Sequence, residues 1–275
     1  MPPEISVILV NWNGKRWLQK CLASLASQTY KPVEIIFVDN ASTDDSVVFV
    51  QQTFPNVKIV QSTTNLGFAQ GNNLGIAEAR GTYIMLLNTD TWIESDFIAK
   101  IHQRYIETGA DVLTPQQIGY EETIPASLET STIDIFGYPS PMHETGSTKH
   151  KLFFGGGACL YFSKKLYEET GGLDNDFFMY SEEVDWFWRL HLLRKKIVRA
   201  YDLTFHHAEQ GSAIKVTQLR YHMFLWRNQN ALQMLLKNYR ASTLAFILPW
   251  YFFQNCAEMF VFFCIGRFRI AFSIP

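Results

Sequence analysis

Short runs of apolar residues alternate with amphipathic stretches along the first ninety residues of the chain. The runs lie at residues 5–10, 33–38, 57–60 and 83–87. Each run is continuous rather than alternating, as expected for a strand that is covered on both faces. Apolar residues recur at helical spacing from Leu18 to Leu25, and residues 69–80 suit a further helix. This alternation with short connections predicts an α/β fold built on a mostly parallel, doubly wound sheet.

The pattern is less regular in the second half of the chain. Residues 118–150 contain several Pro, Gly, Ser and Thr and little periodicity, which predicts a long loop near the ligand-binding edge of the sheet. A fifth apolar strand is expected over residues 158–162, and a helix is expected to begin near Ser181. The length of the chain fits one large α/β domain over residues 1–235, followed by an apolar helical segment over residues 236–275.

Polar side chains gather where the predicted strands end. Asn11 and Asn13 follow the first run, Asp39 ends the second, and Asn88 and Asp90 follow the fourth. Polar residues at any one of these places could be present only because loops favour them, with no role in binding. Doubly wound sheets bind ligands outside the carboxyl ends of their strands, so three such turns at one edge predict a binding site.

A stretch rich in glycine and asparagine, residues 65–73, precedes the fourth strand. Gly67 permits a tight turn and close backbone approach, while Asn65 and Asn72 supply neutral donors and acceptors. The stretch also opens a predicted helix, and backbone N–H groups at a helix N-terminus favour a diphosphate. The alternative is an ordinary capped loop with no ligand.

Three acids, Glu182, Glu183 and Asp185, fall in the first turn of the helix predicted from Ser181. Acids in a first turn favour the helix dipole, which offers a purely structural explanation. A run of aromatic residues and Met over residues 177–180 precedes them, however, and apolar surroundings favour the protonated form of a carboxyl. A carboxyl in such surroundings suits a general base, and both explanations stay open at this point.

Asp90 and the pair His206 and His207 are the candidates for metal ligands. A hard divalent cation beside a diphosphate prefers carboxylate oxygens, and an acid just past a buried strand can present one. The histidine pair follows a strand-like apolar stretch, where a single histidine would usually be structural. Capping by Asp90 is the competing explanation.

Charge and cysteine content narrow the class of protein. The formal net charge is −2 over 275 residues, so no basic field covers the chain and we expect no nucleic-acid partner. The four cysteines form no CxxC pair, and the first residues show no secretory signal. We therefore expect reduced thiols and a cytoplasmic location.

An apolar stretch over residues 244–266 carries few polar residues, among them Glu258. Its length would permit a membrane span, but a glutamate near its middle is costly in hydrocarbon. Basic residues lie on both sides, at Arg240 and Arg267. We expect helices at a membrane surface, with a span and a buried packing or oligomer helix as the alternatives.

Together these motifs resemble the blocks of the inverting, GT-A-fold glycosyltransferases of family 2, especially the rhamnosyltransferase-like group. The blocks, spread over residues 4–235, are SVILVNWNG, EIIFVDNASTDDS, NLGFAQGNNLGI, YIMLLNTD and GGLDNDFFMYSEEVDWFWRL. The resemblance implies a GT-A-type sheet with helices on both faces and a nucleotide-sugar donor. It also implies Mg²⁺ or Mn²⁺ as the cofactor, and an acceptor hydroxyl on a glycan or lipid-linked glycan.

On the donor side, the resemblance implies that Asp39 contacts the base or ribose of the nucleotide. Further nucleotide-binding positions are expected at Asn11, Asn13, Asn65, Gly67, Asn72 and Asn88. Asp90 would be the metal-binding acid of a DXD-type motif whose first acid is replaced by Asn88. One of His206 and His207 would be the later metal-associated histidine.

On the acceptor side, the resemblance implies that Glu183 is the catalytic base, where the family usually has Asp. Glu182 or Asp185 could share this task, and we also assign Gly156, Gly157 and Tyr180 to the acceptor side. The implied reaction is a single displacement from a dTDP- or UDP-linked sugar, in cell-surface polysaccharide synthesis at the inner face of the plasma membrane.

Two other classes of protein compete with this interpretation. In a catalytically impaired nucleotide-sugar or glycan-binding module, Asn88 and Glu183 would be signs of decay. A sugar-phosphate nucleotidyltransferase shares the sheet type but would carry a glycine-rich loop with Lys or Arg directly after the first strand. The segment Asn11-Trp12-Asn13-Gly14 at that place argues against it.

Overall fold

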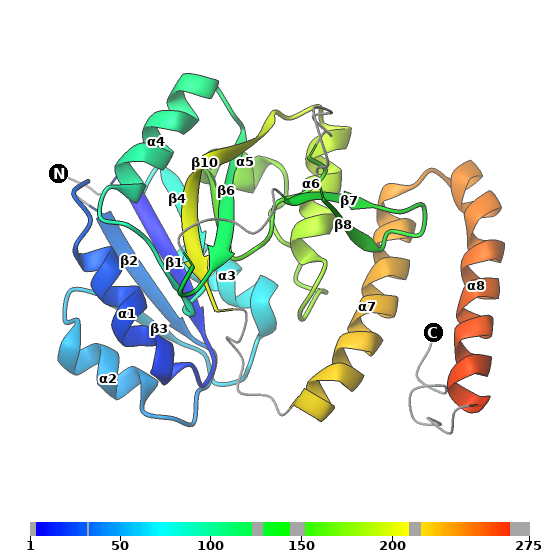
Figure 1. Ribbon diagram of the computed structural model, residues 1–275, viewed down its shortest axis with the longest axis horizontal. Coiled ribbons are helices and arrows are strands. Elements are labelled where there is room, and N and C mark those ends of the chain that lie inside the picture. Colours follow the sequence, from blue (N-terminus) through cyan, green and yellow to red (C-terminus); the bar gives the residue numbers. More distant parts are fainter. Residues whose placement is uncertain (1–3, 32, 123–128, 144–151, 209–215, 265–275) are drawn as a thin grey trace.

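An eight-stranded sheet forms the centre of the molecule (Figure 1). The computed structural model describes residues 4–31, 33–122, 129–143, 152–208 and 216–264. The strands of the sheet are β1 (Ile5–Asn11), β2 (Val33–Asp39), β3 (Lys58–Gln61), β4 (Tyr83–Leu87), β5 (Thr91–Trp92), β6 (Val112–Gly119), β9 (Cys159–Ser163) and β10 (Ile197–His207). Their order is β3-β2-β1-β4-β9-β6-β10-β5, so the four predicted N-terminal strands lie together in one half.

The two halves of the sheet differ in strand direction. β1, β2, β3 and β4 pair in parallel, as the sequence predicts. β9 then lies antiparallel between β4 and β6, whereas β6 and β10 are again parallel to each other. β5 pairs antiparallel with the end of β10 at the edge of the sheet. The result is a mixed sheet, and the α/β fold class is confirmed.

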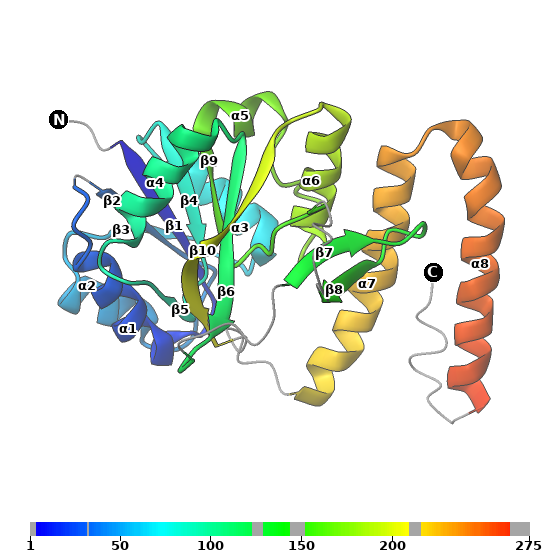
Figure 2. The same cartoon turned by 45° about the horizontal axis from the view of Figure 1, so that its top comes forward.

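Helices cover both faces of the sheet (Figure 2). One face packs against α1 (Lys15–Ala26), α2 (Ser46–Thr53) and α4 (Phe97–Thr108). The other packs against α3 (Gly67–Ala77), α5 (Lys164–Glu169) and α6 (Glu182–Leu192). Successive side chains of a strand point to opposite faces, so Val7 and Leu9 belong to the first core and Ile8 to the second. This two-sided burial explains why β1 is a continuous apolar run.

Part of the segment 118–150, for which we expected no regular structure, forms a two-stranded hairpin. It consists of β7 (Glu129–Ile133) and β8 (Pro139–His143), which pair antiparallel. Asp134 closes the turn, because its Oδ1 accepts the backbone N–H groups of Phe136 and Tyr138 at 2.9 Å each. Prolines and short polar strands hide this hairpin from a periodicity analysis. Residues 123–128 and 144–150 of the expected loop lie outside the described residues.

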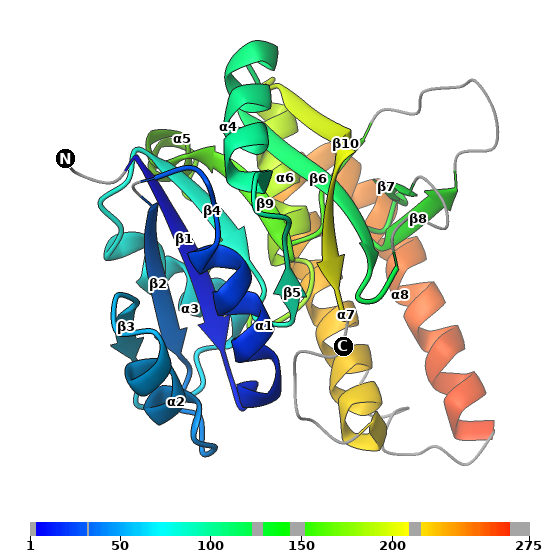
Figure 3. The ribbon, with the colours of Figure 1, turned by 60° about the vertical axis from the view of Figure 1, so that its left-hand side comes forward.

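Two long helices, α7 (Val216–Asn238) and α8 (Ala241–Cys264), lie side by side beyond the sheet (Figure 3). They share a third core with α6 and with Tyr138, which lies in the turn between β7 and β8. In this core, Tyr251 of α8 donates its hydroxyl to the backbone oxygen of Asn228 at 2.8 Å. The domain boundary expected after residue 235 falls in the last turn of α7. Among the described residues, no helix combines the length and apolarity needed to cross a bilayer.

Candidate functional site

The ends of β1 and β2 place Asn11 and Asp39 next to each other, because these two residues are partners in the parallel ladder. Ser42 joins them: its hydroxyl accepts a hydrogen bond from Asn11 Nδ2 at 3.0 Å, and its backbone N–H donates to Asp39 Oδ2 at 3.1 Å. Both side chains are almost fully buried, and no described group donates to the Oδ1 atom of either. Buried acceptors normally have a partner, so these two oxygens suit the donor groups of a base or ribose.

Asn13 joins the loop after β1 to the loop after β2. Its backbone lies in the left-handed region, with φ of 54°. Its Oδ1 accepts the backbone N–H groups of Thr43 at 2.7 Å and Asp44 at 3.2 Å. The structure therefore gives Asn13 a role in shaping the edge near Asp39. A direct contact between Asn13 and a nucleotide remains a prediction.

Asp90 and His207 face each other at the carboxyl ends of β4 and β10. The distance between Asp90 Oδ1 and His207 Nε2 is 3.1 Å, and the Asp90 side chain is 1% exposed. Asn88 lies at the same place, with its Nδ2 atom 3.4 Å from His207 Nε2. On the other side of the ring, Gln117 Oε1 lies 3.0 Å from His207 Nδ1. A proton on Nδ1 donated to Gln117 leaves the lone pair of Nε2 directed toward Asp90.

This pair fits a divalent cation that is shared with a diphosphate. In the tautomer with the proton on Nδ1, the Asp90 carboxylate and the Nε2 lone pair are both electron donors, and a cation bound by both would remove their repulsion. Within the described parts of the chain, no group of three or more His, Cys, Asp or Glu side chains converges on one point. The remaining ligands would have to be phosphate oxygens and water, as is usual for Mg²⁺.

The structure separates the two histidines of the pair. Because neighbouring strand residues point to opposite faces, only His207 lies beside Asp90. His206 stacks on Trp92 instead, with ring centroids 3.4 Å apart and planes inclined by 8°. Burial of this ring lowers the pKa of His206, which favours its neutral form. His206 thus has a packing partner of its own at the edge of the sheet.

Glu182 and Glu183 are the first two residues of α6. The segment Gly155 to Ala158, which precedes β9, lies between these glutamates and the Asp90–His207 pair. Glu182 is buried, whereas Glu183 is partly exposed. Burial raises the pKa of Glu182 well above its ordinary value, and the neighbouring Glu183 charge raises it further. Burial also raises the pKa of Glu183, against the lowering effect of backbone hydrogen bonds, including one from Gly157. Glu183 is therefore the more exposed acid of the pair, with its Oε2 atom buried, and its raised pKa suits a general base.

The segment from Gly155 to Ala158 connects the two acidic places. The oxygen of Ala158 accepts the backbone N–H of Asn88 at 2.9 Å, which ties one end of the segment to the Asp90 side. At Gly157, a Cβ atom would lie 3.2 Å from the Phe68 ring and 3.8 Å from the Glu183 carboxyl carbon. At Gly156, a Cβ atom would meet nothing within 4 Å. Gly157 thus lies next to Glu183 and Gly156 faces open space, while a place for both on the acceptor side remains a prediction.

The comparison with known families settles what kind of protein carries this arrangement. Residues 6–171, more than half of the chain, match the family described as Glycosyl transferase family 2. The chain belongs to this family.

Two relatives show how far the similarity of this glycosyltransferase extends. Glycosyltransferase GlyG of Streptococcus pneumoniae is 32% identical over 127 residues, which cover 45% of this chain and 42% of GlyG. The N-acetylglucosaminyl-diphospho-decaprenol L-rhamnosyltransferase of Mycobacterium tuberculosis is 25% identical over 213 residues, which cover 67% of this chain and 69% of that protein. The match therefore spans less than half the length of GlyG but more than two thirds of the rhamnosyltransferase.

Solved structures confirm the GT-A type of fold for this glycosyltransferase. Mannosyltransferase PcManGT from Pyrobaculum calidifontis, solved in complex with GDP-Man and Mn²⁺, superposes with a TM-score of 0.62 at 16% identity. The superposition covers 99% of this chain and 74% of the mannosyltransferase. The mixed sheet with helices on both faces is thus the architecture that the sequence motifs imply.

Gly67 joins the edge of the sheet near Asp39 to the loop that carries the glutamates. Its φ is 75°, and a Cβ atom would lie 2.0 Å from the backbone oxygen of Phe178. Its own oxygen accepts a hydrogen bond from Asn40 Nδ2 at 2.8 Å. Asn65 Oδ1 accepts the Gly67 N–H at 2.9 Å, and Asn72 Nδ2 donates to Phe68 O at 2.9 Å. These contacts explain the glycine and asparagine content locally, and a role in binding the donor remains a prediction for all three residues.

Asp185, which we considered as an alternative base, is engaged in a buried network. Its side chain is 0% exposed, and Arg189 and Lys237 form ion pairs with its Oδ2 at 2.9 and 3.0 Å. Asn238 Nδ2 donates to its Oδ1 at 2.9 Å. Both oxygens of this carboxylate are thus engaged by cationic or amide groups rather than by an acceptor. The arrangement thus favours Glu183 over Asp185 as the base.

Sequence reasoning missed Gln117, the residue that orients His207. The residue belongs to β6, a strand that contains Pro115 and adjacent glutamines and so lacks an apolar run. A strand of this kind gives no periodic signal. Gln117 is the register partner of Phe205, two residues before His207, so its proximity to the His207 ring is visible only once β6 and β10 are paired.

Proposed function

We propose that this protein transfers a sugar from a dTDP- or UDP-linked donor to a hydroxyl of a glycan or lipid-linked glycan, with inversion at the anomeric carbon. One observation carries the proposal: Asp90 with His207 on one side and Glu183 on the other are tied to the same short segment, Gly155 to Ala158. A displacement reaction needs this division, because the leaving diphosphate and the attacking hydroxyl lie on opposite faces of the sugar.

Residues at the strand ends would bind the nucleotide-sugar donor. The free Oδ1 atoms of Asn11 and Asp39 would accept hydrogen bonds from the nucleoside. Asp90 and His207 would hold Mg²⁺ or Mn²⁺ against the diphosphate, and the metal would neutralise the charge that develops on the leaving group. Gln117 would keep the lone pair of His207 directed toward the metal.

The acceptor half belongs to Glu183. Its carboxylate would take the proton of the acceptor hydroxyl as that oxygen forms a bond to the anomeric carbon. The bond from the anomeric carbon to the diphosphate oxygen breaks at the same time, and the electron pair leaves with the nucleoside diphosphate. Because attack and departure take place on opposite faces, the configuration inverts. Glu182 is too deeply buried to reach an acceptor and would act only through its effect on Glu183.

The relatives support a nucleotide diphosphate sugar as the class of donor and a lipid-linked acceptor. The mannosyltransferase with the same fold was crystallised with GDP-Man and Mn²⁺, a nucleotide diphosphate sugar with a divalent metal. The mycobacterial relative is named for a rhamnosyl transfer to a lipid-linked acceptor. By analogy, we propose a hexosyl or rhamnosyl donor and a role in cell-surface polysaccharide synthesis.

Helix α8 supports a further part of the proposal, contact with the inner face of the cell membrane. Its outward side is apolar: Phe246, Trp250 and Phe253 follow one another at helical spacing and are 72%, 58% and 68% exposed. Its polar residues lie on the opposite side, since Asn255 is buried and Glu258 is only partly exposed. A helix at the surface of a water-soluble protein has the reverse distribution. An outward apolar side is typical of a helix in contact with lipid, where a lipid-linked acceptor would also lie.

A panel of nucleotide sugars tests the proposed function. The protein is incubated with dTDP-, UDP- and GDP-linked sugars, with Mn²⁺ or with EDTA, in the presence of polyprenyl-diphosphate-linked acceptors. We expect release of one nucleoside diphosphate and formation of a glycosylated lipid only with Mn²⁺ or Mg²⁺. Binding of a nucleotide sugar without transfer or hydrolysis for any pair would instead support the impaired binding module.

A further inference from the structure

The turn that leads into the catalytic helix has a strained backbone. Tyr180 and Ser181 both lie in the left-handed region, with φ of 69° and 68°. Two consecutive residues with a Cβ atom rarely adopt this conformation, because the Cβ atom approaches a backbone oxygen in each. Such a turn persists only when its surroundings enforce it. Glu182 and Glu183 follow directly, so this turn determines where their carboxyl groups point.

The side chain of Ser181 does not stabilise the turn. Ser181 is the residue that caps α6, but its hydroxyl forms no capping hydrogen bond with the described N–H groups of the helix. Capping hydroxyls normally satisfy these N–H groups. The force that holds the turn in place must therefore come from another element.

That element is α7. Asn230 of α7 is 4% exposed, and its Nδ2 donates to two successive carbonyl oxygens of the turn, Met179 O at 3.0 Å and Tyr180 O at 2.5 Å. One amide group thus binds the carbonyl groups before and after the α-carbon of Tyr180, the first of the two left-handed residues. A side chain with two N–H donors is required for this, and asparagine provides it within a short length.

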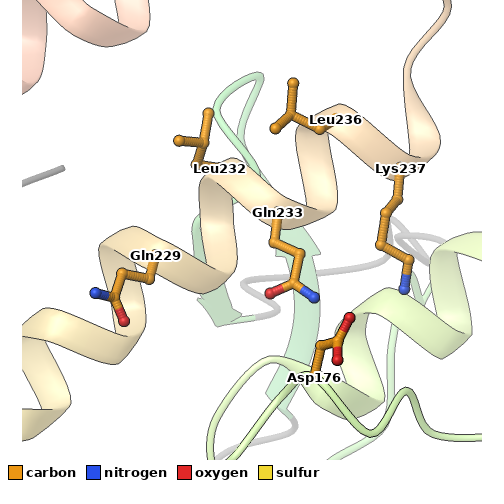
Figure 4. Close-up of a pocket in the computed structure, with 6 residues that line it drawn as sticks. All are labelled: Asp176, Gln229, Leu232, Gln233, Leu236 and Lys237. Carbon is orange, nitrogen blue, oxygen red and sulfur yellow. The ribbon is translucent and has the colours of Figure 1, made fainter.

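The same helix makes a second attachment beyond the glutamates. Lys237 and Asn238, at the end of α7, bind the Asp185 carboxylate, which follows Glu183 by two residues. Figure 4 shows Gln233 and Lys237 directed from α7 toward the loop that carries Asp176. α7 therefore holds the chain on both sides of Glu182 and Glu183.

We propose that Asn230 is a positioning residue that holds the Tyr180–Ser181 turn in its left-handed conformation and thereby directs the Glu183 carboxylate toward the acceptor. The inference rests on the proposed function, in which Glu183 is the base. Asn230 touches neither the donor edge nor the sugar, and it acts only through the turn.

The structure offers variants that separate positioning from general stability. Asn230→Ala removes the amide, and Asn230→Asp keeps its shape but replaces the N–H donors with oxygens. Asn228→Ala is the matched control, because Asn228 is also buried in α7 but binds the Tyr138 hydroxyl at 3.0 Å. Ser181→Gly removes one of the two Cβ atoms that oppose the left-handed conformation, while Tyr180 keeps the other.

Two readouts are measured on the full-length protein. Hydrogen exchange of the peptide that covers residues 177–184 reports the turn without any donor sugar. Steady-state kinetics report kcat and the donor KM. We expect Asn230→Ala and Asn230→Asp to raise exchange in this peptide and to lower kcat by roughly 10- to 100-fold with little change in KM, as a misplaced base would. Asn228→Ala should change neither value.

The decisive comparison is the double variant. The loss of kcat that Asn230→Ala causes should be clearly smaller when Ser181→Gly is already present, because one of the two left-handed residues then no longer needs the amide. Unchanged exchange in Asn230→Ala, or an equal loss of kcat with and without Ser181→Gly, would overturn the proposal. If no nucleotide sugar is turned over by the wild type, the proposed function fails. The exchange data then still show whether Asn230 holds the turn.

Discussion

The proposed site has a donor end, with Asn11, Asp39, Asp90 and His207, and an acceptor end, with Glu182 and Glu183. These two ends are positioned in different ways. The donor end is built from strand ends: Asn11 and Asp39 are ladder partners, and a single serine, Ser42, joins them. The acceptor end is built from a left-handed turn that α7 holds from a distance of about fifty residues along the chain. Groups on a sheet edge are aligned by the sheet itself, whereas the glutamates depend on contacts between elements that are remote in sequence.

The two ends also differ in charge. At the donor end, the Asp90 carboxylate lies 3.1 Å from the His207 ring, and the Asn88 amide approaches the same ring nitrogen. At the acceptor end, two carboxyl groups are adjacent, and burial raises the pKa of both. In the proposed reaction, the donor end would hold charge, and the acceptor end would bind and release a proton.

We expect the largest effect on kcat from a substitution that changes only the acceptor end. Glu183→Gln keeps the size of the side chain but cannot accept a proton. We expect kcat to fall by roughly 10²- to 10⁴-fold, the usual effect of losing a general base. Donor affinity, measured by calorimetry with Mn²⁺, should stay near that of the wild type, because Asp90 and His207 are untouched. Full transfer activity in this variant would show that the base is another residue.

We expect the next largest effect, on metal-dependent nucleotide binding, from substitutions that change only the donor end. Asp90→Asn removes the carboxylate that faces His207, and we expect metal-dependent binding of the nucleoside diphosphate to weaken by about 10- to 100-fold. His207→Ala should act in the same direction, whereas His206→Ala is the matched control on the opposite face of β10. Calorimetry with and without Mn²⁺ measures the difference. Equal losses for both histidine variants would place the metal elsewhere.

A smaller effect tests whether the acceptor end lies at a lipid surface. Trp250→Ser combined with Phe253→Ser removes two outward aromatic side chains of α8 and leaves the inward Tyr251 in place. Since a buried aromatic side chain contributes about 1.5–3 kcal/mol, we expect binding to anionic vesicles to fall at least tenfold. Point variants are preferable to truncation, because Ile247 and Tyr251 belong to the third core. Unchanged vesicle flotation would argue for a protein partner on this face.

We expect the smallest effect, on thermal stability, from removing the buried carboxyl group of Glu182 at the acceptor end. The pKa of Glu182 is higher in the folded protein than its ordinary value of 4.5, so the folded state binds a proton more tightly than the unfolded state. Stability therefore falls as pH rises above 4.5. Glu182→Gln cannot ionise, so it should raise Tm at pH 7 to 8 by roughly 2–4 °C, with the gain disappearing below the ordinary pKa. Differential scanning calorimetry across this pH range measures it, and a lower Tm at every pH would contradict the assignment.

The difference between the two ends also decides what the sequence could predict. The runs at residues 5–10, 33–38 and 83–87 lie within or match β1, β2 and β4, because burial on both faces produces continuous apolar runs. The polar residues after them were found from the same rule. By contrast, the hairpin β7–β8 and the strand β6 carry prolines and polar residues that give no period.

Tertiary contacts account for the rest of what the sequence could not show. The separation of His206 from His207 depends on which face of β10 meets Asp90. The network around Asp185 depends on Lys237 and Asn238, which lie more than fifty residues further on. Spacing alone cannot distinguish an acid that binds such partners from one that faces an acceptor, since both occupy the first turn of α6.

The anomeric configuration of the product tests the central claim most directly. The donor identified in the nucleotide-sugar panel is incubated with its acceptor and Mn²⁺, and the anomeric proton of the transferred sugar is followed by NMR. A single displacement, with the diphosphate at Asp90 and His207 and the hydroxyl at Glu183, predicts a product whose anomeric configuration is opposite to that of the donor. A product with retained configuration would contradict this division of the site.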